Sequence, residues 1–234
     1  MNLPDIGVPY AVRRSARAKH LQAAVRKGQV EVVVPGWAQA RHVRRFVDHA
    51  RGWIIAKSRQ LEEHTGTVLP QRCESGSVVR LDGETVDLRV EAGFWPEPSI
   101  EHTGNLLLRV PLVAGRSPEK DARRLLRAWL VERVERAARH AIARFAPRLG
   151  VAPAGLEIKD QQTLWGSCGR HGKIHLNWRL VGAPPPVFDY IVVHELCHLV
   201  ERNHGPKFWQ LVAELMPGYA AHKSWLREHG SLLG

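Results

Sequence analysis

The amino-acid sequence predicts an α+β fold in which a β-rich N-terminal region precedes a mostly helical C-terminal domain. Runs of β-branched residues bounded by turn residues occupy most of the first 110 or so positions. Beyond residue 115, apolar residues recur mainly at the helical spacing of three and four positions. We therefore divide the chain into a basic, β-rich region of residues 1–114 with one long helix, and a second domain of residues 115–234.

The N-terminal region carries four main strand signals and one helix signal. The strands are predicted at Gln29–Val34, Ser77–Leu81, Glu84–Val90 and Asn105–Val110, and the helix runs from Ala38 to about Glu63. The pair Asp82-Gly83 separates two of these strands and is typical of a two-residue hairpin turn. Pro35 ends the first strand, and a central strand would not tolerate it. Gly52 interrupts the helical pattern, so a kink or two helices are expected.

The C-terminal domain is predicted to contain four helices and two short strands. The helices are Glu119–Phe145, Pro184 to Glu201, Pro206 to about Leu215 and roughly Tyr219 to Glu228, and the strands are Leu156–Lys159 and Lys173–Asn177. Pro147 and Gly150 are expected to end the first helix. Three consecutive prolines from Pro184 open the second helix, because proline suits a first helical turn.

The composition is that of a globular chain in a reducing compartment. The 234 residues are 44% hydrophobic, which is enough for a sizeable core. The first residues lack the apolar stretch of a signal peptide, and no run of about 18 apolar residues predicts a transmembrane helix. Three cysteines (Cys73, Cys168 and Cys197) do not resemble a disulfide framework. We expect a soluble, cytoplasmic protein with no membrane contact.

The net charge of +11 is concentrated near the N-terminus. Residues 1–60 contain 12 Lys and Arg against 3 Asp and Glu, a balance of +9, whereas the remaining residues contain 22 against 20. Such an asymmetry fits a surface that contacts nucleic acid or another polyanion. It also fits a solvated, arginine-rich surface, because charge alone is a weak signal.

The stretch His194-Glu-Leu-Cys-His198 carries the chemistry. In a helix, positions i and i+4 lie on one face, so both imidazoles can reach one metal ion. Glu195 lies about 100° further round, where its carboxylate can take a proton from water instead of binding the ion. Most apolar residues of the segment face away from the histidines, as in a buried helix that presents ligands to a cleft. Imidazole ligands at this spacing favour one Zn²⁺ per chain.

A catalytic zinc ion usually has a third protein ligand, and His204 is the first candidate. It follows His198 by six residues, and the glycine after it tolerates the turn that would fold its imidazole back over the metal. The spacing matches that of metzincin enzymes, but Glu201 occupies the position of their glycine. Glu214 on the next predicted helix is the alternative third ligand, as in thermolysin-type sites.

The segment Val192–Trp209 resembles the active-site helix of the YgjP-like metallopeptidase family, which is related to the SprT-like proteases. The resemblance covers nearly the whole chain and includes Leu164–Cys168, Ile174–Trp178, Pro217–Leu226, Arg13–His20 and Trp53-Ile54. It implies a small zincin-like metallopeptidase domain preceded by a β-rich region. It also implies a zinc ion held by His194, His198 and His204.

The expected reaction is hydrolysis of a peptide bond in a peptide or protein substrate. Zinc lowers the pKa of bound water towards about 7 and polarises the scissile carbonyl. Glu195 takes the water proton and later delivers it to the leaving amine. A second donor for the oxyanion is needed, and Tyr219, His222 and Lys223 are the candidates.

Trp165, Gly166, Ser167 and Asn177 are the candidate substrate-binding residues. They belong to two segments that predict a sheet edge over the cleft, with which an extended substrate can pair through its backbone. Gly166 would permit a close backbone approach. The alternative interpretation is a tight turn packed by Trp165.

Two other functions fit the sequence. The first is a metal-dependent hydrolase of nucleotides or other phosphoanhydrides, with phosphate contacts from the basic N-terminal region. That chemistry favours several carboxylates and two metal ions, whereas this site offers mostly imidazoles. The second is a nucleic-acid-associated protease, whose binding would weaken steeply with salt.

Overall fold

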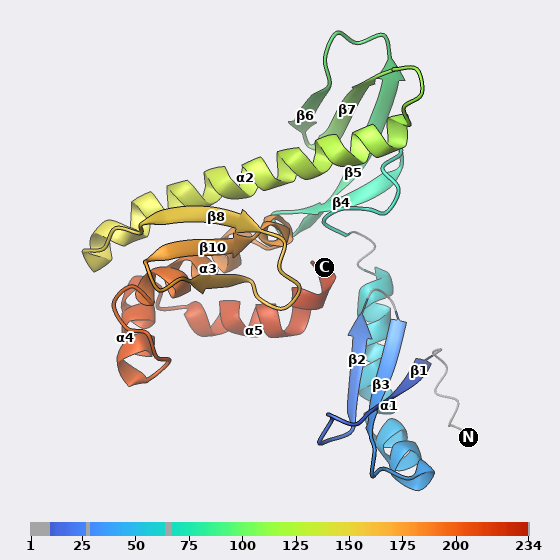
Figure 1. Cartoon of the computed structure of the whole chain (residues 1–234), viewed down its shortest axis with the longest axis vertical. Helices are drawn as coiled ribbons and strands as arrows, with labels where there is room; N and C mark the ends of the chain where they lie inside the picture. Colours follow the sequence, from blue (N-terminus) through green and yellow to red (C-terminus); the bar gives the residue numbers. More distant parts are fainter. Residues whose placement is uncertain (1–9, 27–28, 64–66, 234) are drawn as a thin grey trace. The chain divides into compact units, whose positions relative to one another are not determined.

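The computed structural model describes residues 10–26, 29–63 and 67–233 (Figure 1). The chain forms two compact units, residues 1–65 and 66–234, each with its own apolar core. Both units combine sheet and helix, so the α+β class predicted from the sequence is confirmed. All three cysteines are free.

The first unit is a three-stranded sheet with one long helix. Its elements are β1 (Tyr10–Ser15), β2 (Gln22–Arg26), β3 (Gln29–Pro35) and α1 (Ala40–Glu63). The strand order is β1-β3-β2, with β1 parallel and β2 antiparallel to β3. Alternate valines of β3 pack against apolar residues of α1, and the buried set is Val30, Val32, Val34, Ala38, Val43, Val47 and Ile54.

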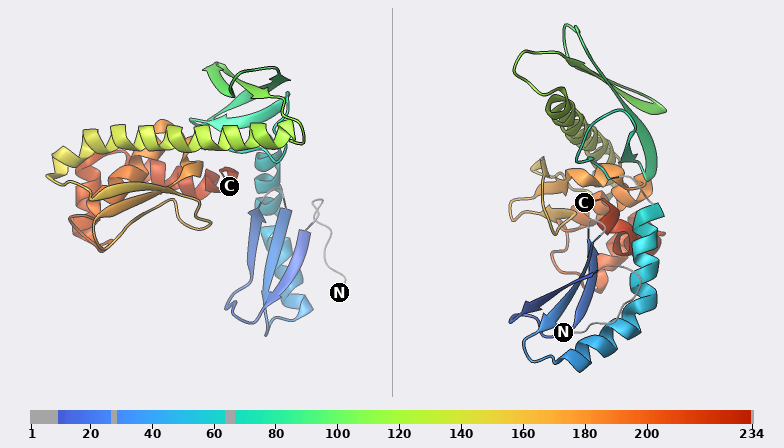
Figure 2. Two further views of the ribbon diagram at one scale, coloured as in Figure 1. Left: turned by 45° about the horizontal axis from the view of Figure 1, so that its top comes forward. Right: turned by 90° about the vertical axis from the view of Figure 1, so that its right-hand side faces the viewer.

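Two local expectations for this unit need correction. β3 is the central strand, although Pro35 argued against that position. The proline is tolerated because it is the last residue of the strand, so the interior of the ladder keeps all its donors. Of the two alternatives at Gly52, two separate helices are excluded, because α1 continues to Glu63 as one helix; the single helix is bent, as Figure 2 shows.

The second unit begins with a four-stranded sheet of order β4-β5-β7-β6. Its strands are β4 (Ser77–Leu81), β5 (Glu84–Gly93), β6 (Ser99–Thr103) and β7 (Asn105–Pro111). The predicted hairpin is present, since Asp82 and Gly83 connect β4 to β5 with φ values of 52° and 92°. Positive φ at both turn residues is the conformation that an Asp-Gly pair favours.

A second, three-stranded sheet and four helices complete this unit. The sheet has the order β8-β10-β9, with β8 (Gly155–Lys159), β9 (Gly166–Cys168) and β10 (Lys173–Asn177). The helices are α2 (Pro118–Leu149), α3 (Pro185–Cys197), α4 (Pro206–Leu215) and α5 (Tyr219–His229), with short 3₁₀ turns η1 (Trp178–Gly182) and η2 (Gly230–Leu232). The helices and strands predicted for residues 115–234 are therefore present with shifted ends.

The helix α2 connects the two sheets of the second unit (Figure 2). Its N-cap is Ser117, whose side chain accepts a hydrogen bond from the Lys120 N–H, and its C-cap is Gly150 in the left-handed conformation. Pro147 was expected to end the helix, but it lies inside it. The helix runs two residues further, to Leu149, and Gly150 caps it. The buried side of α2 recurs every three or four residues, and it comprises Ala122, Leu126, Leu130, Val134, Ala138, Ala141, Phe145 and Ala146.

The boundary between the two units differs from the one drawn on the sequence. The sequence suggested a division after residue 114, whereas the structure divides the chain after residue 65. Leu88 and Leu106 of the four-stranded sheet belong to the same apolar cluster as Leu126 and Leu130 of α2. Residues 66–114 therefore share a core with the C-terminal helices. Among the described residues, no helix has both the length and the apolar character to cross a membrane.

Candidate metal centre

The helix α3 positions the first two histidines. Most of its residues are buried, and Val192, Val193 and Leu196 have no exposed surface. The helix was predicted to reach Glu201 but ends at Cys197, because the N–H groups of residues 199–201 turn back to the carbonyls of residues 196 and 197. His198 is the C-cap and keeps helical dihedral angles (φ −68°, ψ −13°), so it still lies one turn after His194.

The three candidate histidines lie together. Their potential ligand atoms are all within 4.8 Å of one another. The Nε2 atoms of His194 and His204 are 3.0 Å apart, and the ring centroids of His198 lie 4.9 Å and 4.7 Å from those of His194 and His204. Within the described ranges, this is the one group of three or more His, Cys, Asp or Glu side chains close enough to hold an ion.

Phe208 and Glu201 fix the orientation of these rings. Phe208 is fully buried, and its ring centroid lies 4.5–4.9 Å from the centroids of all three imidazoles. The Nδ1 atom of His198 lies 3.1 Å from the Glu201 carbonyl oxygen. If that nitrogen carries the hydrogen, the Nε2 atom has a free lone pair, which is the usual arrangement of a metal-binding histidine.

Glu214, the alternative third ligand, does not join the histidines. It is exposed on α4, and its carboxylate accepts a hydrogen bond from Gln210 one turn earlier on the same helix. Of the two candidates named from the sequence, the structure places His204 beside the other imidazoles.

Burial controls the charge of the groups on α3. Loss of water lowers the pKa of His194 to about 3, with smaller contributions from His198, His204 and Lys223. Glu195 is 4% exposed, and burial raises the pKa of its carboxyl to about 8. The imidazole is therefore neutral at pH 7 in the metal-free chain, and the carboxyl exchanges its proton near neutral pH.

The edge strand β9 lies directly against Glu195. A Cβ atom added to Gly166 would lie 2.6 Å from the Glu195 Oε1 atom and 2.8 Å from its Cγ atom. Only glycine permits this approach without displacing the carboxylate. β9 is an edge strand, since it pairs with β10 and ends the sheet. The sheet edge proposed from the sequence is present at Gly166, and the group that lies close to this backbone is the Glu195 side chain.

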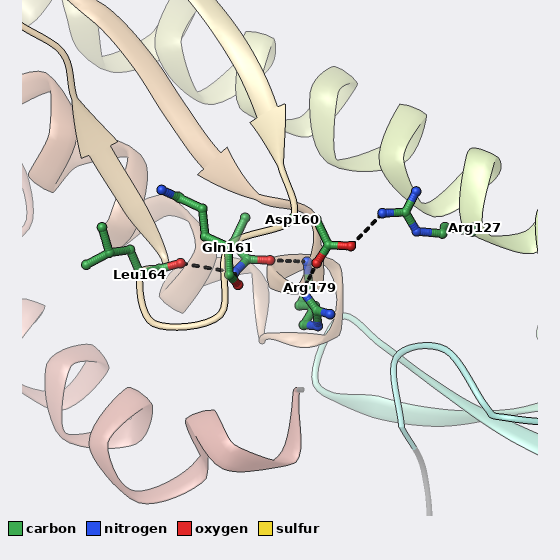
Figure 3. A network of polar contacts seen from close by, with 6 residues as sticks. Arg127, Asp160, Gln161, Leu164 and Arg179 are labelled. Atoms are coloured by element: carbon green, nitrogen blue, oxygen red, sulfur yellow. Dashed lines mark hydrogen bonds and ion pairs between the residues drawn. The ribbon is translucent and has the colours of Figure 1, made fainter.

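Asn177 has a different place from the one expected of a substrate-binding residue. Its side chain is 2% exposed, and its amide nitrogen donates to the carbonyls of Gln161 and Leu164 at 2.7 Å and 3.0 Å. Both amide hydrogens are thus used within the protein. Asp160, next to this loop, binds Arg127 of α2 and Arg179 of η1 (Figure 3). The side chain of Asn177 therefore holds the loop that leads into β9.

The other sequence candidates lie at varied positions. Trp165 is half-buried beside Gly230, and Ser167 is half-buried on β9 opposite His175. Tyr219, half-buried at the start of α5, stacks on Trp209 at a centroid distance of 5.4 Å. His222 lies beside Gly218, with its Nε2 atom 3.9 Å from a Cβ built there.

Tyr190 is a residue near the site that the sequence analysis missed. Its ring lies edge-on to His194 at 5.9 Å and stacks on Tyr219 at 6.3 Å. Burial raises its pKa to about 12, so its hydroxyl keeps its hydrogen at neutral pH. The signal was available in the sequence, because Tyr190 precedes His194 by four positions and so shares its helix face.

The model of the family described as YgjP-like, metallopeptidase domain, matches residues 19–229. The chain belongs to the YgjP-like metallopeptidase family. Among solved structures, it is similar to the metallopeptidase zymogen of Pyrococcus abyssi abylysin, with 25% identity, 42% of this chain and 94% of that chain covered, and a TM-score of 0.35. No curated protein matches the chain. The match of the family model confirms the resemblance to YgjP-like proteins and, together with the mixed α+β structure, the fold class expected from the sequence.

The residues present fit the metal ion that a metallopeptidase requires. Three imidazoles converge, and neutral imidazole nitrogen is a common ligand of zinc and other first-row transition metals. The Nδ1 atom of His194 is buried without a hydrogen-bond partner, and its low pKa keeps the ring neutral. Bringing unprotonated ring nitrogens to within 3.0 Å of each other is unfavourable unless a hydrogen or a cation lies between them.

Replacement of Gly166 by alanine should strain the contact between β9 and Glu195. Because the new methyl group would overlap a buried carboxylate, we expect a loss of roughly 1–3 kcal/mol in the free energy of unfolding. Urea denaturation of the metal-free protein measures this loss. Gly155→Ala in β8 is the matched control, since its Cβ would meet Lys173 only at 3.6 Å. Equal losses in both variants would contradict the close contact.

Glu195→Gln should remove a pH-dependent loss of stability from the metal-free protein. The pKa of about 8 lies above the ordinary value of 4.5, so between them the folded chain keeps a proton that the unfolded chain has released. The stability of the wild type should fall as the pH rises through this window, by up to about 1.4 kcal/mol per pH unit. The glutamine variant lacks this fall.

Urea denaturation at pH 5 and pH 8 with a chelator present measures the effect. The contribution of His194 is common to both proteins and cancels in their difference. A difference between wild type and variant that is the same at both pH values would show that the carboxyl is not perturbed by burial.

Proposed function

We propose that this metallopeptidase is zinc-dependent and cleaves peptide bonds with His194, His198 and His204 as the metal ligands and Glu195 as the general base. The observation that carries the proposal is the cluster of three imidazoles beside a buried carboxylate that touches an edge strand. These three histidines would hold the zinc ion and would leave a ligand position for water or substrate, as catalytic zinc sites do.

The proton chemistry rests on Glu195. A zinc ion at this site supplies a Lewis acid that polarises the substrate carbonyl and lowers the pKa of water to about 7. With a pKa near neutrality in the metal-free chain, Glu195 is suited both to accept a proton from water and to return it to the leaving amine. The apolar surroundings on α3 exclude bulk water from the carboxylate and so strengthen its interactions with the reacting groups.

The substrate is proposed to bind as an extended strand along β9. An edge strand offers backbone donors and acceptors to a peptide without selecting its sequence. Gly166 places this backbone next to Glu195. Trp165 and Ser167 flank it and are the side chains best placed to contact the substrate, whereas Asn177 holds the loop before the strand.

The hydroxyl of Tyr190 is the best placed candidate to stabilise the oxyanion. Its ring contacts His194, and Glu195 is among the groups that raise its pKa. A neutral phenol donates a hydrogen bond to developing negative charge. Tyr219 and His222, proposed from the sequence, are the alternatives; the ring of Tyr219 stacks on that of Tyr190.

A nucleotide or phosphoanhydride hydrolase is the weaker alternative. In the described part of the chain the metal cluster consists of imidazoles only, with one carboxylate beside it. Phosphoryl transfer usually relies on two metal ions held largely by carboxylates. Peptide hydrolysis needs one ion and one base, which is what this site offers.

Glu195→Gln should abolish peptide cleavage without loss of metal. Removal of a general base costs about 10²–10⁴-fold in rate, and the variant keeps all three histidines. Zinc-loaded protein is incubated with an unbiased peptide mixture, and mass spectrometry identifies the cleaved bonds. Their positions within the peptides show whether the enzyme is an endopeptidase and which residues it prefers. Glu214→Gln, an exposed carboxylate on α4, is the matched control and should cleave as the wild type does. Hydrolysis of nucleoside triphosphates but of no peptide by the wild type would refute the proposal.

A nucleic acid or other polyanion is proposed as a second partner, bound by the basic first unit. Arg14 near the end of β1 is exposed, and so are Arg17 and Lys19 in the turn that follows it. Arg13 forms an ion pair with Glu31 at 2.7 Å. The exposed face of α1 adds further arginines, which are Arg41, Arg45 and Arg51. Accessible cations of this density suit contacts with phosphates.

Replacement of Arg14, Arg17 and Lys19 by glutamine should weaken binding of a single-stranded oligonucleotide. Removing one cation that binds a phosphate reduces the slope of log K against log salt by about 0.7, so the three changes together should reduce it by about 2. Fluorescence anisotropy at several salt concentrations measures the slope. Glutamine at Arg124, Arg136 and Arg139 of α2 removes the same charge from the other unit and serves as control. An unchanged slope in the first variant would exclude this surface.

A further inference from the structure

His204 is held differently from the other two histidines. His194 and His198 belong to α3 and its cap, whereas His204 lies in the turn before α4 and its side chain is exposed. An exposed loop side chain samples several rotamers unless neighbouring groups restrict it. The position of His204 therefore depends on contacts outside α3.

Trp209 makes two contacts with His204. Its indole Nε1–H donates a hydrogen bond of 3.1 Å to the backbone carbonyl of His204. Its ring lies beside the His204 ring at a centroid distance of 5.8 Å and an angle of 29°. One contact fixes the backbone and the other restricts the imidazole. Trp209 itself belongs to the first turn of α4, where its backbone N–H bonds to the Gly205 carbonyl at 3.2 Å.

The helix α5 also contacts Trp209. Tyr219 stacks on the indole at 5.4 Å and 16°, and the Lys223 ammonium lies 4.0 Å from the ring centroid. Tyr219 in turn stacks on Tyr190, whose ring contacts His194. The aromatic rings thus form a closed chain of contacts from His194 through Tyr190, Tyr219 and Trp209 to His204 and back to His194.

We infer that Trp209 is a positioning residue, which holds His204 where it completes the metal site and ties that site to α5. The inference rests on the proposed function, because it assumes that His204 is a metal ligand. It assigns to Trp209 a role beyond packing. Groups that orient metal ligands change metal affinity about 10–100-fold when they are removed.

Trp209→Phe tests the inference, because it keeps an aromatic ring and removes the indole donor. The readout is zinc affinity, measured by competition with a chromophoric chelator. We expect affinity to fall by about 10–100-fold. Trp225→Phe is the matched control: Trp225 is also half-buried and stacks on a histidine, His229, at 5.1 Å and 19°. It should bind zinc as the wild type does.

A double-mutant cycle separates positioning from general destabilisation. If Trp209 acts through His204, Trp209→Phe should cause no further loss of zinc affinity in a His204→Ala background. An equal loss in both backgrounds, or wild-type affinity in Trp209→Phe alone, would overturn the inference. Failure of the proposed function gives a different result. If the wild type binds no zinc, both the proposed function and the inference fail. If the wild type binds zinc but cleaves no peptide, and Trp209→Phe still lowers zinc affinity, only the proposed function fails.

Discussion

The burial of α3 is the constraint on which the candidate metal centre depends. Apolar residues of α3 pack against α2, and both sheets of the second unit contribute residues to the same apolar cluster. His194 and Glu195 lie in this environment because they belong to α3. Water is excluded around them, so the neutral imidazole and the protonated carboxyl are favoured, with pKa values of about 3 and about 8. A neutral imidazole binds metals and a carboxyl with a pKa near neutrality transfers protons. The same burial therefore prepares both functions.

The elements α4 and β9 hold the imidazole rings and the Glu195 carboxylate in place. Phe208 of α4 contacts all three imidazole rings, and β9 brings its backbone against the carboxylate at Gly166. β9 is short, with three residues, and depends on the loop before it. That loop is anchored by Asn177 and, through Asp160, by arginines of α2 and η1. The long helix α2 thus contributes to the site although none of its residues belongs to the histidine cluster.

Local signals in the sequence were sufficient to predict much of the fold and to predict that His194 and His198 lie on one face of a helix. The Asp82-Gly83 turn and the i, i+4 spacing of the histidines depend only on a few neighbouring residues. Features set by contacts distant in sequence were missed. The core that the four-stranded sheet shares with α2 is of this kind. The amide of Asn177 likewise found its partners in a loop 13 and 16 residues away. The early end of α3 at Cys197 was also missed, although it comes from nearby N–H groups that bond to the carbonyls of residues 196 and 197.

The central claim, that three imidazoles bind one zinc ion, is tested most directly by X-ray absorption spectroscopy of the zinc-loaded protein. The account predicts a first shell of about four nitrogen and oxygen atoms at roughly 2.0–2.1 Å, with the multiple-scattering signature of three imidazoles. A shell with sulfur at about 2.3 Å, or with fewer than three imidazoles, would contradict it. In that case the cluster of His194, His198 and His204 would not be the metal site of this metallopeptidase.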